Sequence, residues 1–111
     1  MEALIVVDMQ QGILQGDPKH ELDAVISRIS ELIARVRRAG GVVFFVQHDG
    51  APGEDFAPGA PGWPILDALA PEPQDRIVHK RLNSAFVGTS LTADLKQLEP
   101  ERVLIATELA T

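Results

Sequence analysis

Two uninterrupted apolar runs constrain the fold of this chain more than any other feature. Residues 3–7 (ALIVV) and 42–46 (VVFFV) are aliphatic, β-branched and aromatic, and no polar residue alternates with them. A strand with this pattern is covered on both faces, as in a parallel sheet that lies between two layers of helices. Two shorter runs follow later in the chain. We therefore predict a parallel sheet with strands at residues 3–7, 42–47, 76–80 and 102–107.

Two of the segments between these runs have the spacing of helices. Apolar residues recur every three or four positions from Leu22 to Val36, after Asp17 and Pro18, which suit the cap and the first turn of a helix. Residues 89–98 carry three leucines on one side and predict a second helix. Each predicted helix therefore lies between two predicted strands.

The third segment, residues 49–64, is dense in glycine and proline and has no period. It predicts a long loop, and such loops are usually functional or mobile. A short helix is predicted after it at residues 65–69.

The alternation of strands and helices predicts an α/β fold, Rossmann-like, with three layers and a mostly parallel sheet. The chain stops directly after its fourth run, where a buried strand normally needs a covering crossover. We expect residues 1–111 to form a single domain that lacks its C-terminal portion.

Composition argues against several kinds of partner. The formal net charge of −6 disfavours nucleic acid, because binding to phosphates needs clustered lysine and arginine. No apolar stretch approaches the roughly 20 residues of a membrane span, and the N-terminus lacks the basic region of a signal peptide, so we expect a cytoplasmic protein. The chain has no cysteine, which excludes disulfides, thiolate metal ligands and cysteine catalysis from within these residues.

Three residues with reactive side chains directly follow or end the predicted strands. Ligands of open α/β sheets bind at the carboxyl ends of the strands, where Asp8, His48 and Lys80 stand. Asp8 and Lys80 are the more informative, because each is a charge after a buried run and each would favour the ionised form of the other. We expect them to lie within salt-bridge range. A simple ion pair or a solvated strand end would explain the same spacing without catalysis.

Five segments, taken together and in order, resemble the isochorismatase-like cysteine hydrolases. They are residues 3–10 (ALIVVDMQ), 43–48 (VFFVQH), 77–80 (IVHK), 84–91 (SAFVGTSL) and 102–111 (RVLIATELAT). No single segment is specific, but the set spans the chain and places an aspartate and a lysine at the strand ends that the family uses. The resemblance identifies the chain as the N-terminal part of such a hydrolase.

The resemblance implies a catalytic triad of Asp, Lys and Cys. Asp8 would take the thiol proton, and Lys80 would hold the thiolate, since a nearby cation lowers a cysteine pKa. Leu109 and Ala110 match the position of a cis peptide that helps to shape the oxyanion hole in the family. The family's cysteine comes a few residues after the threonine that Thr111 matches, so it is absent from this chain.

The implied function is hydrolysis of a small amide, carbamoyl or vinyl-ether substrate. Because the nucleophile is absent, we expect the 111 residues alone to be inactive and their full-length parent to be active. As partners we expect a small-molecule substrate and further copies of the protein in a homo-oligomer, with neither nucleic acid nor membrane. The alternative is a non-catalytic fragment or pseudoenzyme that packs against a partner chain.

Three further residues are candidates for a substrate pocket. Trp63 lies in the glycine- and proline-rich loop, Phe86 follows the third strand, and Gln10 follows Asp8. Aromatic side chains suit a small planar substrate, although core packing would account for both of them. For Gln10, ordinary loop polarity is an equally good explanation.

No metal or other cofactor is expected. Relatives that hold a divalent metal use Asp-x-His after the second strand and further histidines in the next loop, whereas this chain has His48 followed by Asp49 and no histidine in residues 49–64. His79 should point to the opposite face from Lys80 and pack, and His20 should be solvated.

Overall fold

The four predicted strands form one parallel sheet. In the computed structural model, which describes residues 1–14 and 22–107, the strand order is β3-β2-β1-β4 and all three pairings are parallel. The strands are β1 (Glu2–Val7), β2 (Val42–His48), β3 (Arg76–Lys80) and β4 (Arg102–Ala106). Each agrees with its predicted range to within one residue at either end, so the parallel sheet and the α/β fold class are confirmed.

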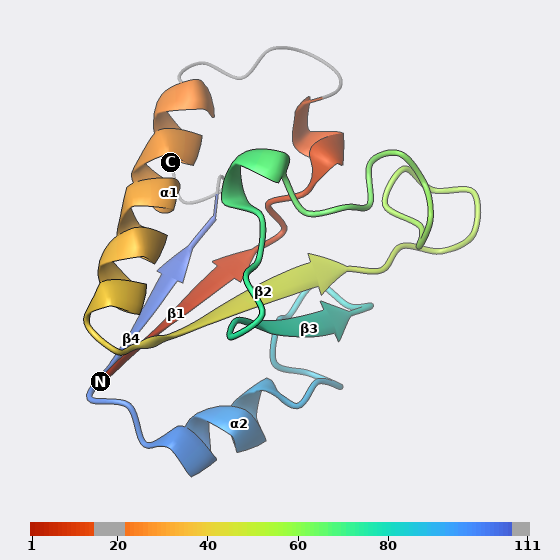
Figure 1. Ribbon diagram of the computed structural model, residues 1–111. Helices are drawn as coiled ribbons and strands as arrows, with labels where there is room; N and C mark the ends of the chain where they lie inside the picture. Colours follow the sequence, from red (N-terminus) through yellow and green to blue (C-terminus); the bar gives the residue numbers. More distant parts are fainter. Residues whose placement is uncertain (15–21, 108–111) are drawn as a thin grey trace.

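One helix covers each face of the sheet (Figure 1). The longer helix α1 (Leu22–Arg38) lies on one side, and the shorter α2 (Leu91–Leu98) lies on the other. Two 3₁₀ turns, η1 (Gln11–Leu14) and η2 (Asp67–Leu69), follow β1 and the long loop. No helix within the described ranges is long and apolar enough to cross a membrane.

The predicted helices differ from the observed ones in two places, while the predicted start at Asp17 lies outside the described residues. The second helix begins at Leu91 instead of residue 89. The Thr89 hydroxyl joins it to the preceding turn, since it donates to the carbonyl of Ala85 and accepts from the Leu91 N–H. The short helix predicted at residues 65–69 is only the 3₁₀ turn η2, in a segment closed by prolines 64 and 71.

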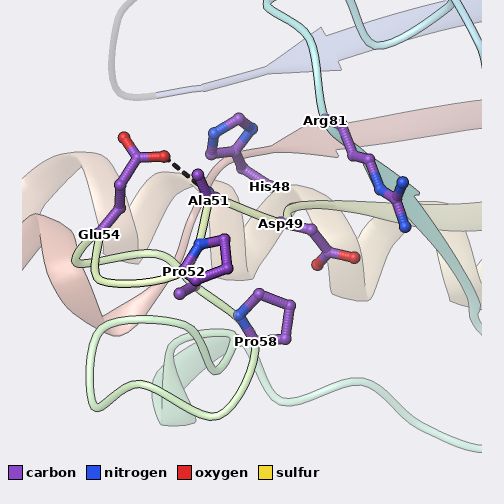
Figure 2. A pocket seen from close by; sticks show the side chains of 9 residues that line it. His48, Asp49, Ala51, Pro52, Glu54, Pro58 and Arg81 are labelled. Carbon is purple, nitrogen blue, oxygen red and sulfur yellow. Dashed lines mark hydrogen bonds between the residues drawn. The ribbon is translucent and has the colours of Figure 1, made fainter.

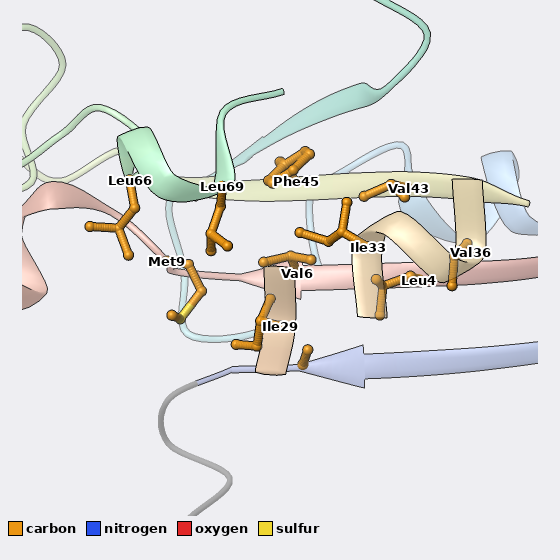
Figure 3. Close-up of a cluster of buried hydrophobic side chains, with 11 residues drawn as sticks. Leu4, Val6, Met9, Ile29, Ile33, Val36, Val43, Phe45, Leu66 and Leu69 are labelled. Atoms are coloured by element: carbon orange, nitrogen blue, oxygen red, sulfur yellow. The ribbon is translucent and has the colours of Figure 1, made fainter. Parts of the chain in front are cut away.

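The alternation of side chains along β1 builds two cores, of which the larger lies under α1 (Figure 3). Leu4 and Val6 point to this face, and the register pairs them with Val43 and Phe45 of β2. All four are at most 1% exposed. The helix closes this core with one buried stripe, formed by Ile29, Ile33 and Val36.

The second core lies under α2. Ala3 and Ile5 point to this face and are joined by Phe44 and Val46, and Leu91 of α2 is fully buried against them. Because α2 has only two turns, this core is smaller than the one under α1. The uninterrupted apolar runs of β1 and β2 therefore reflect central strands with both faces covered.

Apolar side chains of β4 remain exposed on the α2 side. Val103 and Ile105 pair with Ala3 and Ile5, yet they are 44% and 58% exposed. Among the described residues, nothing covers this part of the sheet. The expectation of a single domain that lacks its C-terminal portion stays a prediction, and the exposed strand is compatible with it.

The loop of residues 49–64 packs on the segment after β1. Gln11 N donates to Pro64 O at 2.8 Å, and Gly12 N donates to Gly62 O at 2.9 Å. A Cβ atom on Gly12 would lie 2.7 Å from the Phe56 ring, so only glycine allows this close approach. The loop is therefore fixed against the carboxyl edge of the sheet.

Replacing Ile33 by alanine should destabilise the protein by about 2–5 kcal/mol, because it leaves a cavity between α1 and the sheet. Ile33 is 3% exposed. The matched control is Ile77→Ala, at an isoleucine that is 49% exposed, for which we expect a loss of about 1 kcal/mol or less. Urea unfolding followed by circular dichroism measures both. Equal losses for the two variants would contradict the packing described here.

Candidate functional site

Three side chains from three neighbouring strands converge at the carboxyl edge of the sheet. Lys80 ends β3, His48 ends β2 in register with it, and Asp8 directly follows β1. The Lys80 Nζ atom lies 3.3 Å from Asp8 Oδ1 and 3.4 Å from His48 Nδ1. It also donates to the Leu82 carbonyl oxygen at 3.1 Å. The expected approach of Asp8 and Lys80 is confirmed, whereas their catalytic roles stay a prediction.

The two charged partners differ in their access to solvent. The Lys80 side chain is 3% exposed and the Asp8 side chain is 31% exposed. A buried ammonium is costly unless a counter-charge and acceptors surround it, which is the role of Asp8 here. Asp8 Oδ1 makes no hydrogen bond within the described ranges, so its contact with Lys80 is an ion pair without hydrogen-bond geometry. This carboxylate can still accept a proton.

Asp8 reaches Lys80 through an unusual backbone conformation. In a continued strand Asp8 would follow Val6 onto the α1 face, whereas Lys80 follows Val78 on the α2 face. The φ angle of Asp8 is +59°, which breaks the alternation at this residue. A non-glycine residue in the left-handed region costs roughly 1 kcal/mol or more, and aspartate tolerates it better than most. Such strain concentrates at functional sites.

Gln10 was expected in the substrate pocket, and its position contradicts this. The side chain is fully buried. Its amide nitrogen donates to the carbonyl oxygens of His48 and Trp63, and its amide oxygen accepts from the His48 N–H at 2.9 Å. A buried amide with its donors and its acceptor in use holds the backbone and cannot meet a substrate.

Trp63 belongs to a polar cluster beside the strand ends. Its indole N–H donates to Asp49 Oδ1 at 2.8 Å, and its ring stacks on His79 with centroids 6.1 Å apart. His79 Nδ1 lies 3.1 Å from the same Asp49 oxygen. The His79 side chain is 49% exposed, so the expectation of a packed histidine is wrong, although it does lie opposite Lys80. The edge position of β3 explains its exposure.

The pKa of the Asp49 carboxyl is set by opposing effects. Burial acts to raise the pKa, but the hydrogen bonds from Trp63 and His79 and the positive charges of His79 and Arg81 together lower it below its ordinary value. Asp49 therefore stays ionised and stabilises the base of the loop.

A cavity of about 590 Å³ opens at the carboxyl end of β2, where His48 and Asp49 stand (Figure 2). Its polar lining includes His48, Asp49, Glu54 and Arg81, and small loop residues and prolines complete it. Strand-end position had identified His48 as a candidate. Glu54 and Arg81 were missed, since nothing in the sequence distinguishes them from ordinary surface charges.

The remaining predicted site residues are not brought to this cavity. Phe86 is 40% exposed on the turn that the Ser84 hydroxyl holds, and Trp63 is engaged in the polar cluster. Neither contributes to the lining of the cavity in Figure 2. Leu109 and Ala110 lie outside the described residues. In the described part of the chain, no three His, Cys, Asp or Glu side chains are grouped so that they could hold a metal ion.

Fold and site together define a Rossmann-like α/β structure with a partly buried aspartate–lysine ion pair at the carboxyl edge of its sheet. Comparison with known proteins then identifies its family. Residues 2–106 match the isochorismatase domain, and the chain therefore belongs to the isochorismatase family.

Three relatives illustrate this membership. The chain is 38% identical to a streptothricin hydrolase of Streptomyces noursei over 84% of its own length and 34% of the relative's. It is 30% identical to the ureidoacrylate amidohydrolase of Methylorubrum extorquens, over 97% of the chain and 58% of that protein. The N-carbamoylsarcosine amidase of Thermoplasma acidophilum superposes with a TM-score of 0.86 at 25% identity, covering 96% and 66%. The chain thus spans only one to two thirds of these relatives.

Replacing Asp49 by asparagine should lower stability by an amount of the order of 1 kcal/mol, and the loss should depend on pH. The Asp49 pKa is lowered in the folded state, so its contribution is present above the ordinary carboxyl value and disappears as the pH falls through the lowered value. The difference between wild type and variant should therefore shrink below about pH 4. Urea unfolding at several pH values tests this. Asp55→Asn, at an exposed carboxylate of the same loop, is the control, and a difference that grows on acidification would contradict the assignment.

Proposed function

We propose that this chain supplies the acid–base half of a hydrolase that cleaves small amide or carbamoyl substrates with a cysteine nucleophile. The observation that carries the proposal is the contact of 3.3 Å between the buried Lys80 ammonium and the Asp8 carboxylate. His48, which lies 3.4 Å from the same ammonium, lines a cavity of substrate size. The chain has no cysteine, so the sulfur must come from outside these 111 residues.

Each residue has a definite task in this proposal. Asp8 takes the proton of the cysteine thiol, and the Lys80 ammonium stabilises the resulting thiolate. The thiolate attacks the carbonyl carbon, and the C–N bond breaks as Asp8 returns the proton to the leaving nitrogen. Water then attacks the thioester with Asp8 as base, the acid leaves, and the thiolate is restored. The positive φ of Asp8, which accompanies the approach of its carboxylate to Lys80, supports this proposed role.

The names of the relatives support an amide-type substrate. Two of them are called an amidohydrolase and an amidase, and the most similar one reported above is called a streptothricin hydrolase. The cavity offers donors and acceptors of both charge signs, as a polar amide or ureido group would require. A vinyl-ether substrate would leave these groups with fewer partners. The homo-oligomeric state and the cytoplasmic location stay predictions.

Removing either member of the pair should reduce kcat by about 10²–10⁴ fold, which is the usual contribution of a positioned acid or base. The variants are Asp8→Asn and Lys80→Met, which preserve shape and remove the charge. Lys96→Met, on the exposed side of α2, is the matched control and should retain full activity. The assay uses small amides, ureido compounds and isochorismate. Activity of Lys80→Met equal to that of wild type would show that the pair is only structural.

The nucleophile is tested separately. The 111-residue chain should show no turnover, whereas a chain extended by the reading frame beyond Thr111 should be active, and alanine at the first added cysteine should abolish that activity. Mass spectrometry of the extended protein with a slow substrate should detect an acyl adduct on that cysteine. Substantial turnover by the 111 residues would contradict a cysteine mechanism and favour another nucleophile.

A further inference from the structure

We propose that His48 is a positioning residue that holds the Lys80 ammonium toward Asp8 by accepting a hydrogen bond at Nδ1. The role of this contact in turnover rests on the function proposed above, whereas the contact itself does not. Three observations support the proposal: the small number of partners around Nζ, the hydrogen bonds that hold the His48 backbone, and the fact that His48 both contacts Lys80 and lines the cavity.

The number of partners around Lys80 is the first argument. An ammonium group carries three protons, and one that is 97% buried needs acceptors as well as a counter-charge. Among the described residues, Nζ has two hydrogen-bond partners, the Leu82 carbonyl oxygen and His48 Nδ1, while Asp8 Oδ1 is its ion-pair partner. If His48 did not accept, the Leu82 carbonyl would be the only hydrogen-bond acceptor of the buried group in this part of the chain.

This arrangement fixes the protonation of the ring. Nδ1 can accept only when its lone pair is free, so His48 must be neutral with its proton on Nε2. The electron density at Nδ1 then depends on Lys80, because a cation at 3.4 Å polarises the Nδ1 lone pair. Nε2 makes no hydrogen bond within the described ranges, and its N–H is therefore available toward the cavity that His48 lines.

The backbone of His48 is held by both the oxygen and the nitrogen of the buried Gln10 amide. Gln10 accepts from the His48 N–H at 2.9 Å and donates to the His48 carbonyl oxygen at 3.1 Å. Phe56 meets the imidazole ring edge-on, with centroids 6.4 Å apart. A histidine held at its backbone and at its ring is suited to orient another group, since little freedom is lost when the contact forms.

The direct test of the contact is ¹⁵N spectroscopy of the imidazole groups in the protein. We expect His48 to have an unprotonated Nδ1 and a protonated Nε2. We also expect Lys80→Met to shift the Nδ1 resonance of His48 and to leave that of His79 unchanged. A protonated Nδ1, or an Nδ1 resonance that does not respond to Lys80→Met, would overturn the proposal whether or not turnover has been found.

The kinetic test uses two replacements of nearly equal size. His48→Leu removes the acceptor, and His48→Asn places an amide oxygen near the position of Nδ1. We expect kcat to fall roughly ten- to hundredfold for His48→Leu, as for a lost hydrogen bond to a charged group, with little change in KM, and to be largely restored in His48→Asn. Equal losses in both variants would mean that the ring serves only packing, and would overturn the positioning role.

His79→Asn is the control for a purely structural effect. It alters a neighbouring histidine that contacts Asp49 and Trp63 on the other side of β3, so it should lower stability without changing kcat.

The proposed function and the positioning role of His48 are contradicted by different results. If Asp8→Asn and Lys80→Met leave turnover unchanged, the proposed function is wrong, whereas the spectroscopic result for His48 still decides whether it positions Lys80.

Discussion

The buried ammonium of Lys80 is the constraint on which the rest of the site depends. Transferring such a group out of water costs several kcal/mol even after relaxation, so it persists only where acceptors are already in place. Asp8 supplies the counter-charge, and Leu82 and His48 supply the remaining acceptors. These groups come from three strand ends, which only a parallel sheet in the observed register brings to one edge. The buried Lys80 ammonium therefore requires this strand order and register, because no other arrangement would bring its partners to the same edge.

Strain and rigidity in the surrounding backbone serve the same pair. The left-handed conformation of Asp8 turns its carboxylate across the sheet edge toward Lys80. The chain is held in place directly afterwards, because Met9 is buried in the core under α1 and Gln10 is hydrogen-bonded to the second strand and to the long loop. A strained residue next to a fixed segment cannot relax, which preserves the contact between Asp8 and Lys80.

The long loop of residues 49–64 forms one wall of the cavity in addition to connecting β2 to the following segment. Its base is fixed by Asp49, which joins Trp63 to His79, and its tip closes over Gly12 through Phe56. The cavity that His48 lines forms between this loop and Arg81. Polar and aromatic groups near the strand ends are divided between two tasks: Trp63 and Gln10 hold the loop, whereas His48 and Arg81 line the cavity.

The sequence by itself determined the parallel sheet, both helices and the pairing of Asp8 with Lys80. Uninterrupted apolar runs and helical spacing are local signals, and charges at the ends of buried strands must meet at one edge. Only the tertiary structure decided that Gln10 is buried, that His79 is exposed on an edge strand, and that His48 completes the shell of Lys80. Those outcomes depend on which strand lies next to which and on how a loop without periodicity folds back. Contacts between residues some 30 to 50 positions apart decide this, and no local pattern records them.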